Sequence, residues 1–241
     1  METIKIAHLY YDLMNLYGEH GNVLGLIKSL EEHHFKVITH YYTIDDKIPY
    51  EDYDIFYIGS GNNENFKLTL KDILKRKKEI KKEYEKGKFF LITGNAINLF
   101  GSSYEELNGD SIETLNILKY KAAETDFRIV GEQVYLKENC EEIIGFQNRS
   151  SVLKDVLEEN LFKVKEGTGY APNKEVEGIV SKNFYGTYLL GPIMIRNPYF
   201  KEFFIKEICK YKGIDYKENI NALEKKAYNE YKKNLLNESE S

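Results

Sequence analysis

The chain has 241 residues, of which 42% are hydrophobic, so it is long enough for one large α/β domain with a substantial core. Its net charge of −5 excludes a chain-wide positive field that would attract nucleic acid or acidic lipid. Two cysteines cannot build a disulfide framework, and no run approaches the roughly 18 apolar residues of a membrane span. The N-terminus lacks a signal-peptide pattern. These features predict a soluble, cytoplasmic protein.

The first half of the chain alternates apolar runs with amphipathic segments. The runs have the length of buried strands, and the segments carry the apolar stripe of helices. In chain order we predict strand 4–10, helix 22–35, strand 35–43, strand 54–61, helix 64–87 and strand 88–93. This order predicts a flavodoxin-like α/β fold with a mostly parallel sheet and helices on both faces. Ligands bind at the carboxyl ends of the strands in such folds.

The second half of the chain has a different texture from about residue 115. Segments 127–136, 142–148 and 177–190 are β-like with short turns, which predicts a mixed or antiparallel extension of the sheet. Helices are predicted at 197–213 and 221–236. Because no linker-like stretch interrupts the chain, we interpret residues 1–236 as one domain and 237–241 as a polar tail.

The stretch GKFFLITGNAINLFG, residues 87–101, reads as a strand that turns sharply into a helix. In many α/β hydrolytic enzymes this kind of turn presents a nucleophile. Here the tip consists of Thr93, Gly94 and Asn95, so the turn is predicted without a nucleophile.

The remaining reactive residues do not form a recognisable catalytic or metal site. All five histidines lie in the first 40 residues, and His33 and His34 are adjacent on a predicted helix and so point to different faces. Cys140 falls in a predicted turn and Cys209 in a predicted helix, away from any strand-to-helix elbow. We interpret both as ordinary cysteines and predict no metal.

Two segments resemble phosphate or nucleic-acid sites only superficially. The glycine-rich segment 59–66 (GSGNNENF) matches neither the dinucleotide nor the Walker pattern, although its N–H groups are suited to holding an anion or oxyanion. The lysine-rich run 75–88 is interrupted by glutamates. It is most simply a solvated helix face with Glu–Lys pairs, so no nucleic-acid partner is predicted.

Five segments together resemble a known family. In chain order they are HLYYDLMNLYGEHGN (8–22), FYIGSGNNEN (56–65), FRIVGEQVYL (127–136), GFQNRSS (145–151) and EGIVSKNFYGTYLLGPIMIRNP (177–198). They are similar to the glutaminase subunits, GatD, of lipid II isoglutaminyl synthase, which are class I glutamine amidotransferases of the CobB/CobQ-like group. The resemblance covers most of the chain in the right order, and it identifies Arg128 with the family's glutamine-contacting arginine.

The departures from the family pattern fall on its catalytic pair. Counting back from Gly101, Gly94 stands at the position of the family's cysteine. In the GTYL-x-GP motif the family has histidine at x, and this chain has Leu190. Asn62 replaces the usual glutamine of the glycine loop, and Glu19 replaces the usual aspartate.

The resemblance implies a reaction in which a cysteine thiolate attacks the glutamine carboxamide and histidine passes a proton to ammonia. Gly94 offers no nucleophile and Leu190 no proton, so no catalytic residue is predicted. Loss of such a pair typically costs on the order of 10⁶ in turnover. By resemblance, the residues left to bind a ligand such as glutamine are Gly59, Ser60, Gly61, Asn62, Asn95 and Arg128.

The family's glutaminase subunit works with an ATP-using, Mur-ligase-like partner, MurT, to amidate the D-glutamate of lipid II. The resemblance therefore implies a non-hydrolysing scaffold or glutamine-sensing subunit of a MurT-like ligase, with no cofactor of its own and any ATP bound by the partner. Two alternatives remain open. One is an active glutaminase with an unrecognised nucleophile such as Cys140, and the other is a free-standing small-molecule binding module.

Overall fold

A parallel sheet of five strands forms the centre of the molecule. A computed structural model describes residues 2–239, with side chains up to residue 235. The parallel strands, in spatial order, are β2 (Lys36–Tyr42), β1 (Thr3–Leu9), β3 (Ile55–Ile58), β4 (Phe89–Thr93) and β11 (Phe184–Thr187). Strands β3 and β4 are buried along their whole length, as expected for parallel strands covered on both faces.

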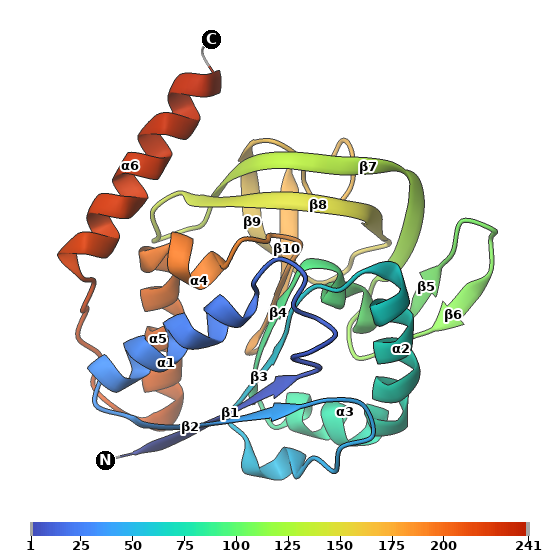
Figure 1. Cartoon of the computed structure of the whole chain (residues 1–241), viewed down its shortest axis with the longest axis horizontal. Coiled ribbons are helices and arrows are strands. Elements are labelled where there is room, and N and C mark those ends of the chain that lie inside the picture. Colours follow the sequence, from blue (N-terminus) through green and yellow to red (C-terminus); the bar gives the residue numbers. More distant parts are fainter. Residues whose placement is uncertain (1, 240–241) are drawn as a thin grey trace.

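Antiparallel strands extend the sheet beyond β11, as the texture of the second half predicts. In spatial order they begin with β10 (Val176–Ser181), β9 (Glu159–Glu166) and β7 (Lys121–Leu136). Strand β7 also pairs with β8 (Ile143–Lys154) in a long hairpin. Figure 1 shows this hairpin arching across the ends of the central strands.

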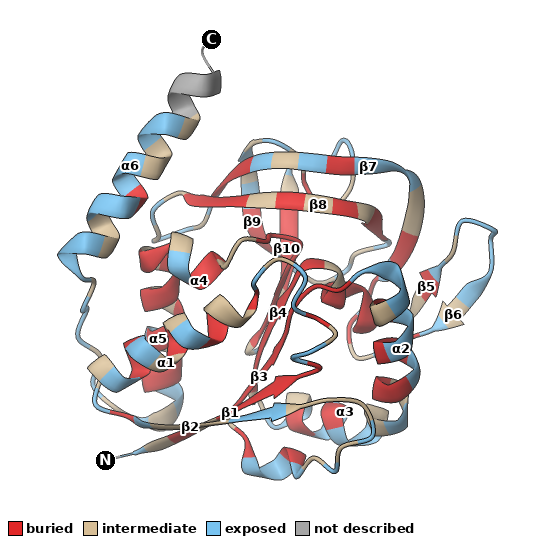
Figure 2. Cartoon of the chain, viewed as in Figure 1, coloured by how far each residue is buried: buried red, intermediate tan, exposed pale blue. Residues whose placement is uncertain are grey.

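Helices cover both faces of the parallel strands (Figure 1). One face packs against α1 (His20–Glu32), α4 (Ile193–Arg196) and α5 (Pro198–Lys212). The other packs against α2 (Asn63–Ile73) and α3 (Lys77–Glu85). Buried residues concentrate in the strands between these layers (Figure 2). The predicted α/β fold, mostly parallel with helices on both faces, is confirmed.

Two local features differ from the sequence prediction. The helix expected at 64–87 is divided by a 3₁₀ turn, Leu74–Arg76. Its second half, α3, ends at Glu85, two residues before Gly87, which has a positive φ of 78°. The turn keeps Ile73 and Ile80 on the core face of both halves. The hairpin of β5 (Ser103–Glu105) and β6 (Ser111–Glu113) was not predicted, because its strands are only three residues long.

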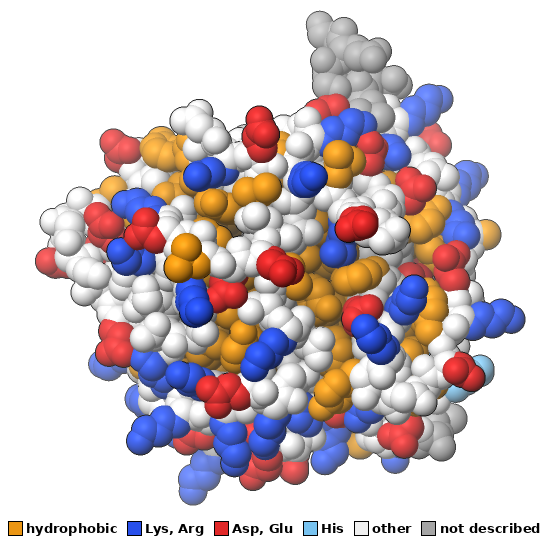
Figure 3. All heavy atoms as spheres, turned by 180° about the vertical axis from the view of Figure 1, so that it is seen from behind, with side chains coloured by type: hydrophobic (Ala, Val, Ile, Leu, Met, Phe, Trp, Pro, Cys, Tyr) orange, Lys and Arg blue, Asp and Glu red, His pale blue; other side chains and the backbone are white. Residues whose placement is uncertain are grey.

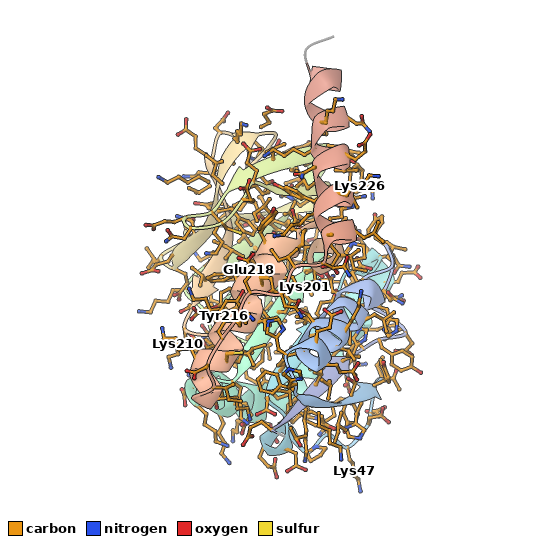
Figure 4. All side chains as sticks on the ribbon, turned by 90° about the vertical axis from the view of Figure 1, so that its left-hand side faces the viewer. Lys47, Lys201, Lys210, Tyr216, Glu218 and Lys226 are labelled. Carbon is orange, nitrogen blue, oxygen red and sulfur yellow. The ribbon has the colours of Figure 1, made fainter. Side chains whose placement is uncertain are left out.

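The C-terminal helix α6 runs from Ala222 to Ser239, so it extends into the segment 237–241 predicted as a tail, of which residues 240 and 241 lie outside the described residues. Its Tyr228 is buried against Val134 and Ile144 of the hairpin. The segment that joins α5 to α6, which carries Tyr216 and Glu218, runs back along α5 (Figure 4).

Buried polar contacts hold this C-terminal region in place. The Tyr216 hydroxyl donates to Glu202 of α5 at 2.8 Å. Lys201, almost fully buried, pairs with Glu224 of α6 at 2.7 Å between nitrogen and oxygen. These contacts fix α6 to α5, and Tyr228 in turn fixes it to the hairpin.

Charged side chains of both signs are interspersed on the surface seen from behind (Figure 3). In the lysine-rich region of α3, Lys86 pairs with Glu83 at 2.8 Å. Lys77 pairs with Glu113 of the neighbouring hairpin. This mixture agrees with the interpretation of the run as a solvated helix face. No helix within the described residues combines the length and the apolar character needed to cross a bilayer.

Asn197 ties the β7–β8 hairpin to the helical layer. Its buried side-chain oxygen accepts the Ile144 N–H at 2.7 Å, and its amide nitrogen donates to the Ile144 carbonyl at 2.8 Å and the Ile193 carbonyl at 3.0 Å. One side chain therefore satisfies backbone groups of both β8 and α4.

We expect Asn197→Ala to lower the free energy of unfolding by about 2–4 kcal/mol, because it leaves several buried backbone groups without partners. Urea denaturation followed by circular dichroism measures the change. The exposed Asn229→Ala on α6 is the matched control and should change stability little. Equal effects of the two substitutions would contradict the bridging role of Asn197.

Candidate functional site

A cavity of about 350 Å³ lies at the carboxyl ends of the parallel strands. The loops that follow β1, β3 and β4 form one wall, and strands β7 and β8 form the other. Neither cysteine nor histidine is present among the described residues that line it. The lining is instead rich in hydroxyl and amide side chains and includes two arginines. The amides are Asn62, Asn63, Asn95, Asn98 and Asn148, and the arginines are Arg128 and Arg149.

The predicted elbow is present at Gly94, but it leads into a 3₁₀ helix, Gly94–Leu99. Gly94 has φ +62°, the left-handed region that other residues enter only with strain. A Cβ at this position would stand 2.6 Å from Ser60 Oγ and 2.8 Å from Leu190 Cδ2, and would also collide with Ser60 Cβ. Ser60 and Leu190 therefore occupy the space that a side chain at residue 94 needs.

Asn95 ties the elbow to the glycine loop. Its side-chain oxygen accepts the Gly61 N–H at 3.0 Å and the Ser60 hydroxyl at 3.1 Å. Its side-chain nitrogen donates to the Gly61 carbonyl at 2.8 Å. One N–H group of the glycine loop, which the sequence suggested is suited to an oxyanion, is thus already bonded to an internal carbonyl.

The other residues of the predicted binding loop are divided between structural and cavity positions. Asn62 caps α2 by accepting the Asn65 N–H at 2.8 Å, and it lines the cavity as well. Gly59 does not line the cavity, since it packs directly against Glu19 and the Met14 carbonyl. Ser60 and Gly61 do line it.

Buried Glu19 supports two cavity loops from below. Its carboxylate accepts the Tyr17 N–H at 2.8 Å, and it also interacts with the Ser60 backbone. Burial raises the pKa of Glu19 to about 7. Glu19, which the resemblance matches to an aspartate of the family, therefore has a structural role next to the cavity.

Arg128 reaches the cavity from an irregularity in β7. The pairing of β7 with β8 shifts register between Glu124 and Ile129, and residues 125–128 line the cavity. A bulge of this kind commonly re-aims side chains toward a binding site. No hydrogen bond or ion pair engages the exposed Arg128 side chain among the described residues, so its guanidinium is open to a ligand.

Strand β8 contributes a polar face that the sequence interpretation did not single out. Gln147, Arg149 and Ser151 alternate along this strand and all three are buried. Asn98 links them to the elbow helix, because it donates to the Ser151 hydroxyl at 3.0 Å and accepts the Tyr188 hydroxyl at 2.7 Å. The available signal was the run of five consecutive polar residues, 147–151, inside a β-like segment, because one face of such a strand has to be buried with its polar groups.

Leu190, which the resemblance matches to the family's histidine, is buried and does not itself line the cavity. Its N–H donates to the Phe146 carbonyl at 2.8 Å. Beneath this segment, fully buried Glu177 accepts the Thr187 hydroxyl at 2.7 Å and the Tyr188 N–H at 2.8 Å. Burial raises the pKa of Glu177 to about 7. The Leu190 side chain, which lies beside Gly94, has no group that transfers a proton.

The two cysteines lie outside the cavity. Cys140 lines a separate hollow with Glu202 and Tyr216, beside α5, and burial raises the pKa of its thiol to about 11. Cys209 is buried within α5, and burial also raises its pKa. Both thiols are therefore largely protonated at neutral pH, which makes them poor nucleophiles.

Comparisons with known proteins agree with this architecture. Residues 5–198 match the model of the CobB/CobQ-like glutamine amidotransferase domain. The chain is 29% identical over 216 residues to the GatD subunit of lipid II isoglutaminyl synthase (glutamine-hydrolyzing) of Staphylococcus aureus, covering 90% of this chain and 88% of that protein. It is 30% identical over 198 residues to GatD of Streptococcus pneumoniae, covering 80% and 76%.

Among solved structures, a glutamine amidotransferase from Thermotoga maritima superposes with a TM-score of 0.50 and 14% identity. The match covers 88% of this chain and 86% of that one. At this identity the likeness concerns the fold alone.

We expect Gly94→Ala to destabilise the protein by more than its backbone conformation explains. Gly109 provides the control, since its φ is +87° but no atom lies within 4 Å of its Cβ position. Gly109→Ala should cost about 1 kcal/mol for the left-handed backbone. Gly94→Ala should cost about 1–3 kcal/mol more, because of overpacking against Ser60 and Leu190. Equal losses in chemical denaturation would contradict the filled site.

The buried Glu177 predicts a specific pH dependence of stability. Its folded pKa of about 7 exceeds the ordinary 4.5, so between these values the folded state keeps a proton that the unfolded state releases. Wild-type stability should therefore fall as pH rises from about 4.5 to about 7, by on the order of a few kcal/mol from this group.

Glu177→Gln should lose this component, so the stability advantage of the wild type over the variant should be larger at pH 5 than at pH 7.5. Denaturation curves at both values measure it. The exposed Glu230→Gln on α6 serves as the control. A pH-independent difference between wild type and Glu177→Gln would show that burial of this carboxyl does not shift its titration.

Proposed function

The chain belongs to the CobB/CobQ-like glutamine amidotransferase family, and we propose that it is a GatD-like subunit without glutaminase chemistry. In this proposal it docks on a MurT-like Mur ligase that amidates the D-glutamate of lipid II. Its similarity to two GatD subunits over most of their length supports the proposal. The subunit itself uses no cofactor, and any ATP binds to the ligase.

The observation that carries the proposal is the packing around Gly94. Ser60 and Leu190 fill the volume in which a catalytic cysteine and histidine would meet. Asn95 occupies the Gly61 N–H that would otherwise stabilise an oxyanion. The nucleophile position, the base position and the Gly61 N–H all differ from what glutamine hydrolysis needs, whereas the fold and the cavity remain.

The retained cavity supports a sensing role beside the scaffold role. Arg128 faces a cavity of about 350 Å³, which is adequate for a free amino acid. We propose that glutamine or a related amino acid binds there and reports nitrogen supply to the ligase. Ammonia for the amidation then comes from another source.

The alternative of a working glutaminase that uses Cys140 has less support. Its thiol lies in a different hollow from Arg128 and has a raised pKa, so it is neither close to the amino-acid site nor activated. A free-standing binding module would keep the cavity but would need no ligase. The docking experiment below separates it from the leading proposal.

Docking is tested by co-expressing the tagged chain with the Mur-ligase-like protein encoded closest to it in its genome. We expect the two to co-purify and to co-elute in gel filtration. The same complex should be recovered when the tag is placed on the ligase and not on the chain. Separate elution in both arrangements would overturn the scaffold proposal and favour the free-standing module.

Hydrolysis is tested by incubating the pure chain with glutamine, alone and with the ligase, and measuring glutamate. We expect release indistinguishable from the protein-free blank, because no nucleophile stands at Gly94. Cys140→Ala should give the same blank rate. Turnover that this substitution abolishes would instead establish Cys140 as the nucleophile.

A further inference from the structure

Arg149 places a buried positive charge beside the cavity, and no ion pair engages it within the part of the chain that the structure describes. Only 5% of its surface is exposed, and it lines the cavity. Its Nε donates to the Gln147 side-chain oxygen at 2.8 Å, Nη2 donates to the Gly169 carbonyl at 2.7 Å, and Nη1 donates to the Ser151 carbonyl. All three partners are neutral. A guanidinium has five N–H groups, so two remain for another acceptor.

The surroundings of Arg149 compensate its charge only in part. Its guanidinium stacks 4.0 Å above the Tyr188 ring. The carboxyl group that acts on it from nearby is Glu177, which is committed to Thr187 and the Tyr188 N–H. Burial raises the pKa of Glu177 to about 7, so it is only partly ionised at neutral pH. A buried cation without a full counter-charge is costly unless a ligand supplies one.

The rest of the cavity carries complementary groups. Arg128 brings a second guanidinium, and Asp126 is the one carboxylate among the described lining residues. The side-chain oxygen of Asn148, also in the lining, is buried and has no hydrogen-bond partner. The cavity therefore offers two cationic donors and an unfilled acceptor, a set that matches two carboxylates and one ammonium group.

A carboxamide finds fewer partners here than a carboxylate does. The Gly61 N–H, a donor in the cavity lining for a carboxamide oxygen, already donates to the Asn95 side-chain oxygen. Arg149 presents donors only, so it attracts a carboxylate by charge and by hydrogen bonding, whereas the NH₂ half of a carboxamide repels it.

We propose that this cavity binds a small amino-dicarboxylate of the size of L-glutamate in preference to the corresponding carboxamide, with Arg149 pairing the side-chain carboxylate and Arg128 the α-carboxylate. The inference rests on the proposed amino-acid sensing role and reverses the preference expected of a glutaminase pocket. With this preference the protein would sense L-glutamate and not L-glutamine.

Isothermal titration calorimetry of the wild-type chain decides the preference directly. L-Glutamate and L-glutamine have nearly the same shape and differ by one charge, so each is the control for the other. We expect L-glutamate to bind at least about ten-fold more tightly, in keeping with one charge-assisted contact. Equal affinity, tighter binding of glutamine, or no heat from either at millimolar concentration overturns the inference.

Variants assign the preference to Arg149. Arg149→Gln should remove the discrimination between the two amino acids, and Arg149→Lys should keep part of it because the charge remains. Arg128→Ala should weaken both ligands by a similar factor. Discrimination that persists in Arg149→Gln would contradict the assignment. Thermal unfolding checks that each variant is folded, and if none folds the wild-type comparison still decides.

Inorganic phosphate separates an amino-acid site from a simple anion site. It should compete only weakly with L-glutamate, and phosphate binding without glutamate binding would overturn the inference. None of these outcomes depends on the ligase, so co-purification with a ligase can succeed while the ligand preference fails, and the reverse.

Discussion

The absence of room at residue 94 is the constraint from which the rest of the site follows. The left-handed backbone of Gly94 brings the end of β4 against the glycine loop, so that Ser60 and Leu190 meet where a side chain would project. Because protein interiors are close-packed, the atoms of Ser60 and Leu190 that fill this space leave no room in it for a nucleophilic side chain. The elbow persists as a packing element between two loops.

What remains around the elbow is a polar cavity whose groups are partly satisfied by the protein itself. Asn95 holds the glycine loop with three hydrogen bonds, and Asn98 joins the elbow helix to β8. This self-pairing rigidifies the wall nearest Gly94. The opposite wall, with Arg128 and Arg149, keeps donors free and so determines which ligand chemistry fits.

The sequence predicted those features that depend on local pattern. Uninterrupted apolar runs gave β3 and β4, and the elbow followed from a strand that ends in Thr93 and Gly94. The resemblance to a family gave the positions of Gly94 and Leu190 in one site.

Features that depend on contacts between distant segments could not be predicted in this way. The occupation of the Gly94 space by Ser60 joins residues 34 positions apart, and nothing in either segment alone specifies it. The role of Arg149 depends on which face of β8 turns toward the cavity, and on the commitment of the nearby Glu177 carboxyl to Thr187 and the Tyr188 N–H. The 3₁₀ break before α3 likewise reflects packing on the core rather than local propensity.

The crowding at Gly94 also bears on evolution. A cysteine introduced at residue 94 by one substitution would be forced against Ser60 and Leu190, so it would lower stability. A smaller residue at position 60 or 190 would relieve that clash, but by itself it would leave a void in a packed region. The three positions are therefore coupled by epistasis, so that the effect of a substitution at any one of them depends on the residues at the other two.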